Sequence, residues 1–123
     1  MIENWNKIKH FKESEFQCKC GCGLNNISFE LAKKLDIARE TANIPFHINS
    51  ACRCETHNKK VGGSKNSSHL KGLAVDIRVR NSNERFIIKK SLYDIGVERF
   101  GDANSFLHCD IDDSKIQKVE WKY

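Results

Sequence analysis

The feature that most constrains this chain is a polar loop that leads directly into an apolar strand, at residues 64–79. His69 and Asp76 lie seven positions apart in this stretch, with Gly72 between them. From residue 73 to residue 79 every second residue is apolar, which predicts a strand with one buried face and places Asp76 on the other face. His69 precedes this strand, and Gly72 allows the chain to bend back. An imidazole and a carboxylate held together suit zinc, although the pair alone suits a surface hydrogen bond equally well.

A second alternating segment, residues 106–111, offers a further ligand from another strand. Its alternation places His108 and Asp110 on one face, about 7 Å apart along the strand. Two strands that carry metal-binding groups on their polar faces can converge on one ion. The sequence therefore predicts a metal site formed by His69, Asp76 and His108, with a half-buried strand histidine as the alternative for His108.

Caps and periodicity predict the other elements. Ser28 suits the N-cap of a helix that ends near Asn43, since Pro45 disfavours a helical residue before it. Ser82 suits the N-cap of a later helix, and Gly96 suits its C-terminal turn. We expect an irregular arm at 1–26, helices at 28–43, 55–60 and 82–95, strands at 46–50, 73–79, 97–100 and 106–111, a turn at 101–105, and an edge strand within 115–121.

These residues also carry a resemblance to a known family. The chain resembles the zinc D-alanyl-D-alanine metallopeptidases of the Hedgehog/DD-peptidase fold, particularly the small single-domain forms of bacteria and phages. The pattern Ser-x-His-x6-Asp, with an upstream Arg53 and a downstream His108, is its most specific part. The matching segments are 49–58, 61–76 and 106–110, with Gln117 and Trp121 near the end and 11–23 as an opening segment.

The resemblance implies both a fold and an activity. The expected fold is α+β, a small and mostly antiparallel sheet with helices packed on one side, as one domain over residues 1–123. The expected activity is zinc-dependent hydrolysis of peptide bonds in peptidoglycan stem peptides. It would be that of a D-Ala-D-Ala carboxypeptidase or of a murein endopeptidase, as in an endolysin.

The resemblance also implies roles for single residues. His69, Asp76 and His108 are the expected zinc ligands. Arg53 is the expected anchor for a substrate carboxylate, because its planar fork matches that group, and an ion pair with Glu55 or Asp76 is the alternative. Ser67 can hydrogen-bond the substrate or orient the loop.

The general base is less clearly assigned. Many family members have an acidic residue three positions before the last histidine, where this chain has Ser105. Asp110 is then the best candidate for the base, and its alternative role is to orient a ligand histidine. Glu98 and Asp102 are the next candidates.

The chain contains six cysteines, which is many for 123 residues. They allow a second, structural zinc, disulfide bonds or free thiols, and the sequence leaves these alternatives open. Cys109 lies on the apolar face of its strand and is expected to be a buried thiol. The other five form two clusters, Cys18, Cys20 and Cys22 in one and Cys52 and Cys54 in the other.

Composition limits the remaining classes. The net charge of +5 favours an anionic partner, which cell-wall polymers and peptide carboxylates provide, so we expect no nucleic acid. We find neither an apolar run of roughly 18 residues nor the apolar core of a signal peptide. We expect a monomer that is made in the cytoplasm and acts on the cell wall once released, as phage enzymes do. A zinc-binding module without catalysis and a nucleic-acid-binding or virion-structural protein are the alternatives.

Overall fold

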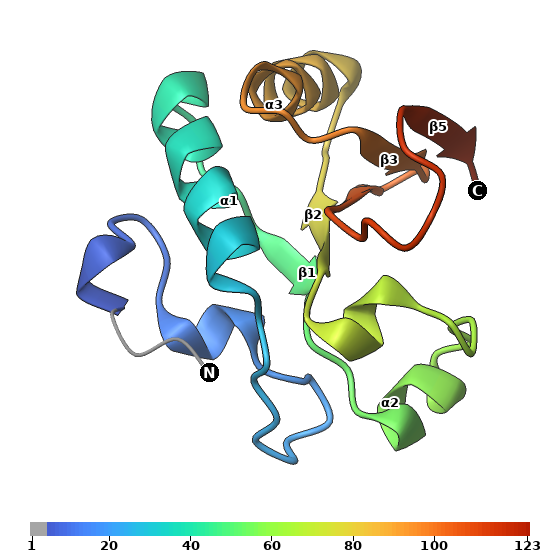
Figure 1. Cartoon of the computed structure of the whole chain (residues 1–123). Coiled ribbons are helices and arrows are strands. Elements are labelled where there is room, and N and C mark those ends of the chain that lie inside the picture. Colours follow the sequence, from blue (N-terminus) through green and yellow to red (C-terminus); the bar gives the residue numbers. More distant parts are fainter. Residues whose placement is uncertain (1–4) are drawn as a thin grey trace.

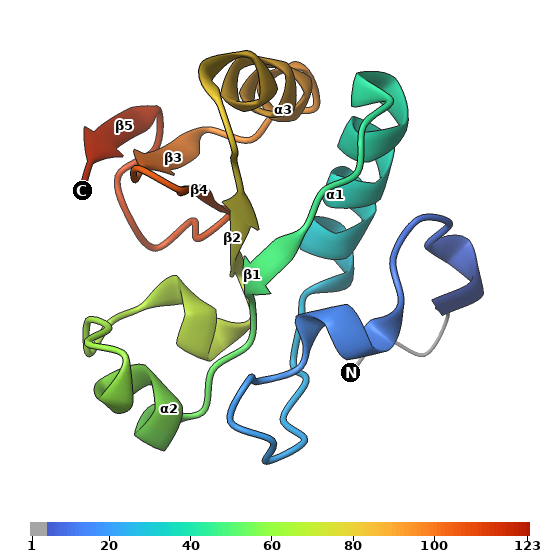
Figure 2. The same cartoon turned by 180° about the vertical axis from the view of Figure 1, so that it is seen from behind.

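A five-stranded sheet organises the molecule, and its strands follow the order β1-β2-β4-β3-β5 (Figures 1 and 2). The computed structural model describes residues 5–123, so the first four residues of the expected arm lie outside the described residues. β5 runs parallel to β3, and the other three pairings are antiparallel. The strands are β1 (Ile48–Ser50), β2 (Ala74–Arg78), β3 (Arg99–Asp102), β4 (Phe106–Asp110) and β5 (Val119–Lys122).

Two long helices, α1 (Phe29–Ala42) and α3 (Ser82–Asp94), cover one face of this sheet (Figures 1 and 2). Their buried side chains share one core with every second residue of the central strands. This confirms the expected α+β class with a mostly antiparallel sheet. The main contributors to this core are Leu31 and Leu35 of α1, Ile88 and Leu92 of α3, Val75 and Ile77 of β2, Phe100 of β3, and Leu107 and Cys109 of β4.

The helix caps are only partly those expected from the sequence. The Ser28 hydroxyl accepts a hydrogen bond from the Leu31 amide at 3.3 Å, as predicted. At α3, the prediction of Ser82 as the cap was wrong by one residue. The side-chain oxygen of Asn81 accepts from the Glu84 amide at 2.8 Å, and Ser82 is the first helical residue. Asn and Ser cap helices about equally well, so composition alone did not separate the two positions.

Shorter elements lie beside the lower end of the sheet in Figure 1. The short helix α2 (Glu55–Lys60) follows β1, and a 3-10 turn, η3 (Ser68–Lys71), leads into β2. Two more 3-10 turns, η1 (Trp5–Lys7) and η2 (Glu13–Phe16), belong to the N-terminal arm. The arm packs through aromatic side chains, as expected, because Trp5 stacks on Phe16 with ring centroids 5.7 Å apart.

The predicted strand boundaries differ from the observed ones mainly in the last third of the chain. β3 begins at Arg99 and continues through Asp102, so the turn expected at 101–105 starts too early. β5 begins at Val119 and pairs with β3 in parallel, so the expected edge strand is confirmed at its end only. Within residues 5–123, no helix combines the length and apolar character that a membrane span requires.

Candidate active site

The three predicted metal ligands come together on the face of the sheet opposite the helices. Asp76 of β2 and His108 of β4 are direct cross-strand partners, and His69 approaches from η3. Oδ1 of Asp76 lies 3.3 Å from Nε2 of His69 and 3.0 Å from Nδ1 of His108. All three side chains are buried, and one ligand atom of each lies within 4.8 Å of the other two.

The outer nitrogen of each imidazole has its own acceptor. Nδ1 of His69 lies 2.7 Å from the carbonyl oxygen of Ala51, which can only accept a hydrogen bond. Nε2 of His108 lies 2.8 Å from Oδ2 of Asp110. These acceptors favour a hydrogen on each outer nitrogen, which leaves Nε2 of His69 and Nδ1 of His108, the two atoms that face Asp76, as the candidate metal-binding atoms. Metal-binding histidines in proteins are almost always fixed in this way, so the residues fit a zinc ion.

The electrostatics of the cluster also favour a cation. Burial opposes ionisation of Asp76, but its contacts with the imidazoles of His108 and His69 outweigh it and hold the pKa of this carboxyl well below its usual range. Burial opposes protonation of His108, but hydrogen bonds to Asp110 and Asp76 prevail and raise the pKa of this imidazole. The cluster therefore places a carboxylate that stays ionised beside two imidazoles.

Asp110 is almost fully buried, at 1% exposure, and both of its oxygens have partners. Oδ2 accepts from His108, while Oδ1 accepts from Nε of Arg99 at 2.6 Å and from the Asp112 amide at 3.1 Å. Burial opposes ionisation of Asp110, but these donors, His108 above all, lower its pKa. The sequence left two roles open for Asp110, and these contacts are those of a group that orients His108.

Arg53 lies on the connection between β1 and α2, next to the metal ligands. Its Nη2 atom is 3.3 Å from Oδ2 of Asp76, so the ion pair considered as the alternative to substrate binding is present. Nε donates to Ser50 at 3.1 Å and Nη1 donates to Asn58 at 3.2 Å. A guanidinium has five N–H donors, so these three contacts leave two for a ligand.

Ser67 has an orienting contact of its own. Its hydroxyl accepts from the His69 amide at 3.2 Å and caps η3. The orienting role considered for Ser67 is therefore present, and contact with a substrate stays a prediction.

A cavity of about 520 Å³ opens over this cluster and is lined by both candidate and unexpected residues. Arg53, Ser67, the three metal ligands and Asp110 form one part of its wall. Sequence reasoning missed the part formed by Arg99, Phe106, Lys115 and Tyr123. Arg99 had one available signal, because a buried carboxylate such as Asp110 requires a cationic partner.

The two alternative candidates for the base lie elsewhere. Asp102 forms ion pairs with Arg85 and Lys89, at 3.0 Å and 2.9 Å. Glu98 borders a different cavity, beside Tyr93 and Val119. Among the residues that line the active-site cavity, the carboxylates are Asp76 and Asp110.

A sheet of this topology with a buried His-Asp-His cluster at the base of a cavity is the arrangement of a zinc metallopeptidase. The family model described as Peptidase M15 matches residues 9–110, well over half of the chain. The chain therefore belongs to the peptidase M15 family, as its resemblance to the zinc D-alanyl-D-alanine metallopeptidases predicted. The comparison with curated proteins gave no match.

Proposed function

We propose that this zinc metallopeptidase hydrolyses peptide bonds in the stem peptides of peptidoglycan, as a D,D-carboxypeptidase or a D,D-endopeptidase. The observation that carries this proposal is the position of Arg53. Its guanidinium pairs with the metal ligand Asp76 and lines the same cavity. A fixed cation beside the reacting centre suits a substrate whose carboxylate lies close to the bond that is cut.

The chain's own groups have distinct tasks in this proposal. His69, Asp76 and His108 hold the zinc, which when bound supplies Lewis acidity and lowers the pKa of a coordinated water to about 7. The two free N–H donors of Arg53 bind the substrate carboxylate and fix the scissile bond relative to the ligand cluster. The backbone carbonyl of Ala51 and the carboxylate of Asp110 keep the two imidazoles in the required tautomers.

Asp110 contributes to the proposed reaction in one of two ways. As a positioning residue, it acts only through His108, and its present contacts support this role. As a general base, it would have to exchange one of its contacts for the attacking water, because all of its observed partners are donors within the protein. The two roles give different results when Asp110 is replaced by Asn.

A defined muropeptide tests the proposal directly. The zinc-loaded protein is incubated with a cross-linked muropeptide dimer and with a monomer that ends in D-Ala-D-Ala, and the products are identified by mass spectrometry. A carboxypeptidase releases free D-alanine from the monomer, and an endopeptidase separates the dimer. A chelator and the substitution His69→Ala should each abolish cleavage.

The opposite result has a clear meaning. If the wild-type protein holds zinc and cuts neither substrate, the peptidoglycan assignment is wrong, and a non-catalytic zinc-binding module of the same fold becomes the better description. Cleavage of intact cell walls by added protein would support action at the wall after release.

A further inference from the structure

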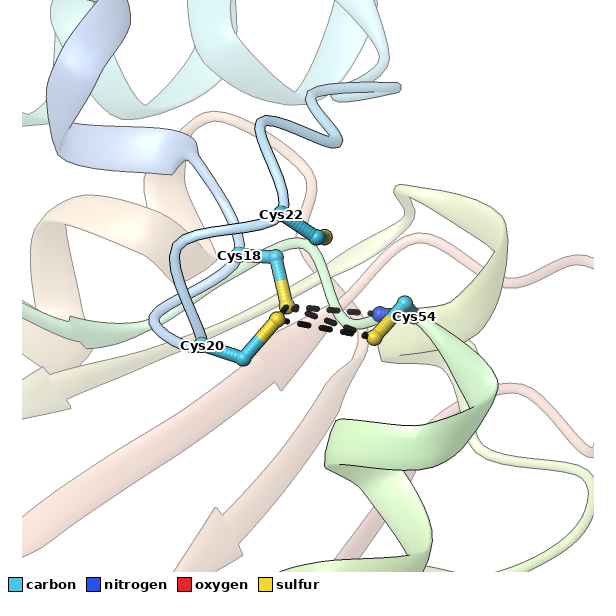
Figure 3. Close-up of side chains that lie close together, drawn as sticks. All are labelled: Cys18, Cys20, Cys22 and Cys54. Carbon is cyan, nitrogen blue, oxygen red and sulfur yellow. Dashed lines mark hydrogen bonds between the residues drawn. The ribbon is translucent and has the colours of Figure 1, made fainter.

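Four cysteines from two segments of the chain lie close together (Figure 3), and they form a group separate from the histidine cluster. Cys18, Cys20 and Cys22 come from the arm between η2 and α1, and Cys54 comes from the connection before α2. The sulfur of Cys18 lies 3.4 Å from that of Cys20 and 3.9 Å from that of Cys54. The sulfurs of Cys20 and Cys54 are 3.7 Å apart, and all four sulfurs lie within 4.8 Å of one another.

This spacing is that of ligands around a tetrahedral metal ion. Zinc binds a thiolate at about 2.3 Å, and tetrahedral geometry then separates two ligand sulfurs by about 3.8 Å. A disulfide requires about 2.05 Å between one pair of sulfurs. Here each sulfur has several near neighbours and no covalent partner, and all six cysteines of the chain are free thiols.

We propose that Cys18, Cys20, Cys22 and Cys54 bind a second zinc ion as a structural site with four thiolates. Four protein ligands close the coordination shell, which is typical of structural zinc and leaves no position for a substrate. The proposal is independent of the peptidoglycan assignment, because it concerns different residues and requires no substrate.

The remaining two cysteines are not part of the site. Cys52 is nearly inaccessible, and its sulfur contacts Oδ1 of Asn25 at 3.5 Å. Cys109 is fully buried in the core between the sheet and the helices. The structure therefore selects four of the five clustered cysteines and provides Cys52 as a control.

The local backbone is arranged around these sulfurs. Gly21 and Gly23 have φ angles of +87° and +85°, which lets the arm fold back so that its three cysteines approach Cys54. The Cys54 amide donates to the sulfur of Cys18, and the His57 amide donates to the sulfur of Cys54, each at 3.4 Å. Backbone N–H groups around coordinating thiolates stabilise their negative charge.

The site has a structural consequence for the active site. It links the arm to residues 51–54, and this short connection also carries Arg53 and the Ala51 carbonyl that holds His69. The Arg53 amide additionally donates to the carbonyl of His69 at 3.3 Å. A metal at the cysteines therefore fixes the chain that positions both the proposed substrate anchor and one catalytic ligand.

Zinc content per chain is the first test, measured by elemental analysis of protein purified under reducing conditions. We expect two zinc ions in the wild type and one in Cys20→Ser, whose side chain is exposed. His69→Ala should also retain one, and the control Cys52→Ala should retain two. A zinc content in Cys20→Ser that equals that of the wild type would overturn the proposal.

A second measurement requires no change at any cysteine. The variant His69→Ala is loaded with cobalt, which replaces zinc and reports its ligands by absorption. Four thiolates should give an intense sulfur-to-cobalt charge-transfer band together with the visible bands of tetrahedral cobalt. A spectrum without thiolate bands contradicts the site, as does alkylation without prior reduction that shows Cys18, Cys20, Cys22 and Cys54 paired in disulfides.

Discussion

At the residue scale, His108 shows how neighbouring side chains fix the orientation of a predicted metal ligand. Its two ring nitrogens contact different carboxylates, Asp76 at Nδ1 and Asp110 at Nε2. Asp110 is itself held by Arg99. The chain Arg99–Asp110–His108 thus extends from the cavity wall to the metal-binding atom, and each member fixes the next.

The substitution Asp110→Asn tests this chain. If Asp110 only orients His108, zinc affinity should fall by roughly ten- to a hundredfold, and excess zinc should restore most of the activity. If Asp110 is the general base, zinc binding should persist and turnover should fall by roughly two to four orders of magnitude, with a changed acid limb of the pH–rate profile. From the contacts of Asp110 we expect the first result. Zinc titration and steady-state kinetics on one preparation separate the two.

Asp102→Asn is the matched control for that substitution. It removes a carboxylate from the neighbouring strand β3, where Asp102 pairs with Arg85 and Lys89. Zinc affinity and turnover should stay close to wild type in this variant. A similar loss in both variants would indicate general damage to the sheet rather than a role specific to Asp110.

Arg53 gives a second prediction at this scale. Arg53→Lys keeps the charge but removes the planar fork, so cleavage of a substrate with a free carboxylate should fall on the order of tenfold or more. Amidation of that carboxylate should cause a similar loss with the wild type and little further loss with the variant. Full activity of Arg53→Lys would exclude the anchoring role and leave Arg53 only its ion pair with Asp76.

At the scale of elements, η3 has the strictest backbone requirement. Gly72 ends this turn with a φ angle of +70°, and its carbonyl accepts from the Ser28 amide at 2.8 Å. A Cβ atom at this position would lie 1.9 Å from the backbone oxygen of Asn26. Gly72 is therefore required both by its left-handed conformation and by the close approach of another backbone segment.

We accordingly expect Gly72→Ala to lower the unfolding free energy more than a substitution at a glycine that has a positive φ angle but no close neighbour. Gly62→Ala is the control, since Gly62 has a φ angle of +77° and no atom near its missing Cβ. The control should lose about 1 to 2 kcal/mol of unfolding free energy, and Gly72→Ala should lose more. Gly72→Ala should also weaken zinc binding, because η3 carries His69. If chemical denaturation gave the same loss of unfolding free energy for Gly72→Ala and Gly62→Ala, the backbone near Asn26 would have to move away from the added Cβ at little cost.

The loop after β4 depends on one buried carboxylate, Asp112. Its oxygens accept from the Ser68 hydroxyl at 2.7 Å, from the Ser114 hydroxyl at 2.6 Å and from Lys71 at 3.2 Å. Burial opposes ionisation of Asp112, but these hydrogen bonds, led by Ser114, hold its pKa well below its usual range. Because Asp112 contacts Ser68 in η3, it joins the end of β4 to the turn that carries His69.

Because the pKa of Asp112 is lowered in the folded protein, the stabilisation that Asp112 provides depends on pH in a defined direction. A carboxyl group whose pKa is lower in the folded state stabilises the protein above its unfolded pKa of about 3.9, and this stability is lost as the pH falls. Asp112→Asn should therefore lower the unfolding free energy at pH 7, on the order of 1 to 3 kcal/mol. The difference from wild type should shrink below about pH 4. The exposed neighbour Asp113 provides the control, and a difference that is constant with pH would contradict the assignment.

The elements that the sequence predicted correctly are those that depend on local patterns of residues, such as alternation and helix caps. Alternation located β2 and β4, and a capping serine located the start of α1. The polar faces of the two strands then brought Asp76 and His108 together, because residues on one face of a sheet share their neighbourhood. The pair Arg99–Asp110 was not predictable in this way, since it depends on the register between β3 and β4. The parallel addition of β5 depends likewise on long-range pairing.

At the scale of the whole molecule, the least predictable feature was which of the five clustered cysteines form the proposed metal site. Cys52 and Cys54 are equivalent in the sequence, but Cys52 points into the core and Cys54 points toward the arm. This difference follows from where β1 ends and from the hydrogen bond between the Cys52 amide and the Phe16 carbonyl, at 3.1 Å. Such contacts between distant segments leave no pattern in the chain itself.

The two proposed metal sites are joined by the connection at 51–54, so we expect their effects on stability to be coupled. A zinc ion that binds only the folded protein adds about 2.7 kcal/mol to its unfolding free energy when free zinc is a hundredfold above the dissociation constant. The wild type, His69→Ala, Cys20→Ser and the double variant are unfolded by denaturant in saturating zinc. If the sites were independent, the losses in the two single variants would add up in the double variant.

We expect the double variant to lose less than that sum, by roughly 0.5 to 3 kcal/mol, the range found for residues that share contacts. The reason is that loss of zinc from the cysteines should loosen Ala51 and Arg53 and already weaken the histidine site in Cys20→Ser. Zinc titration of Cys20→Ser should accordingly show a weaker remaining site than that of Cys52→Ala, whose cysteine cluster is intact. Strict additivity, with equal affinities in these two variants, would mean that the cysteine site stabilises the arm without supporting the active site.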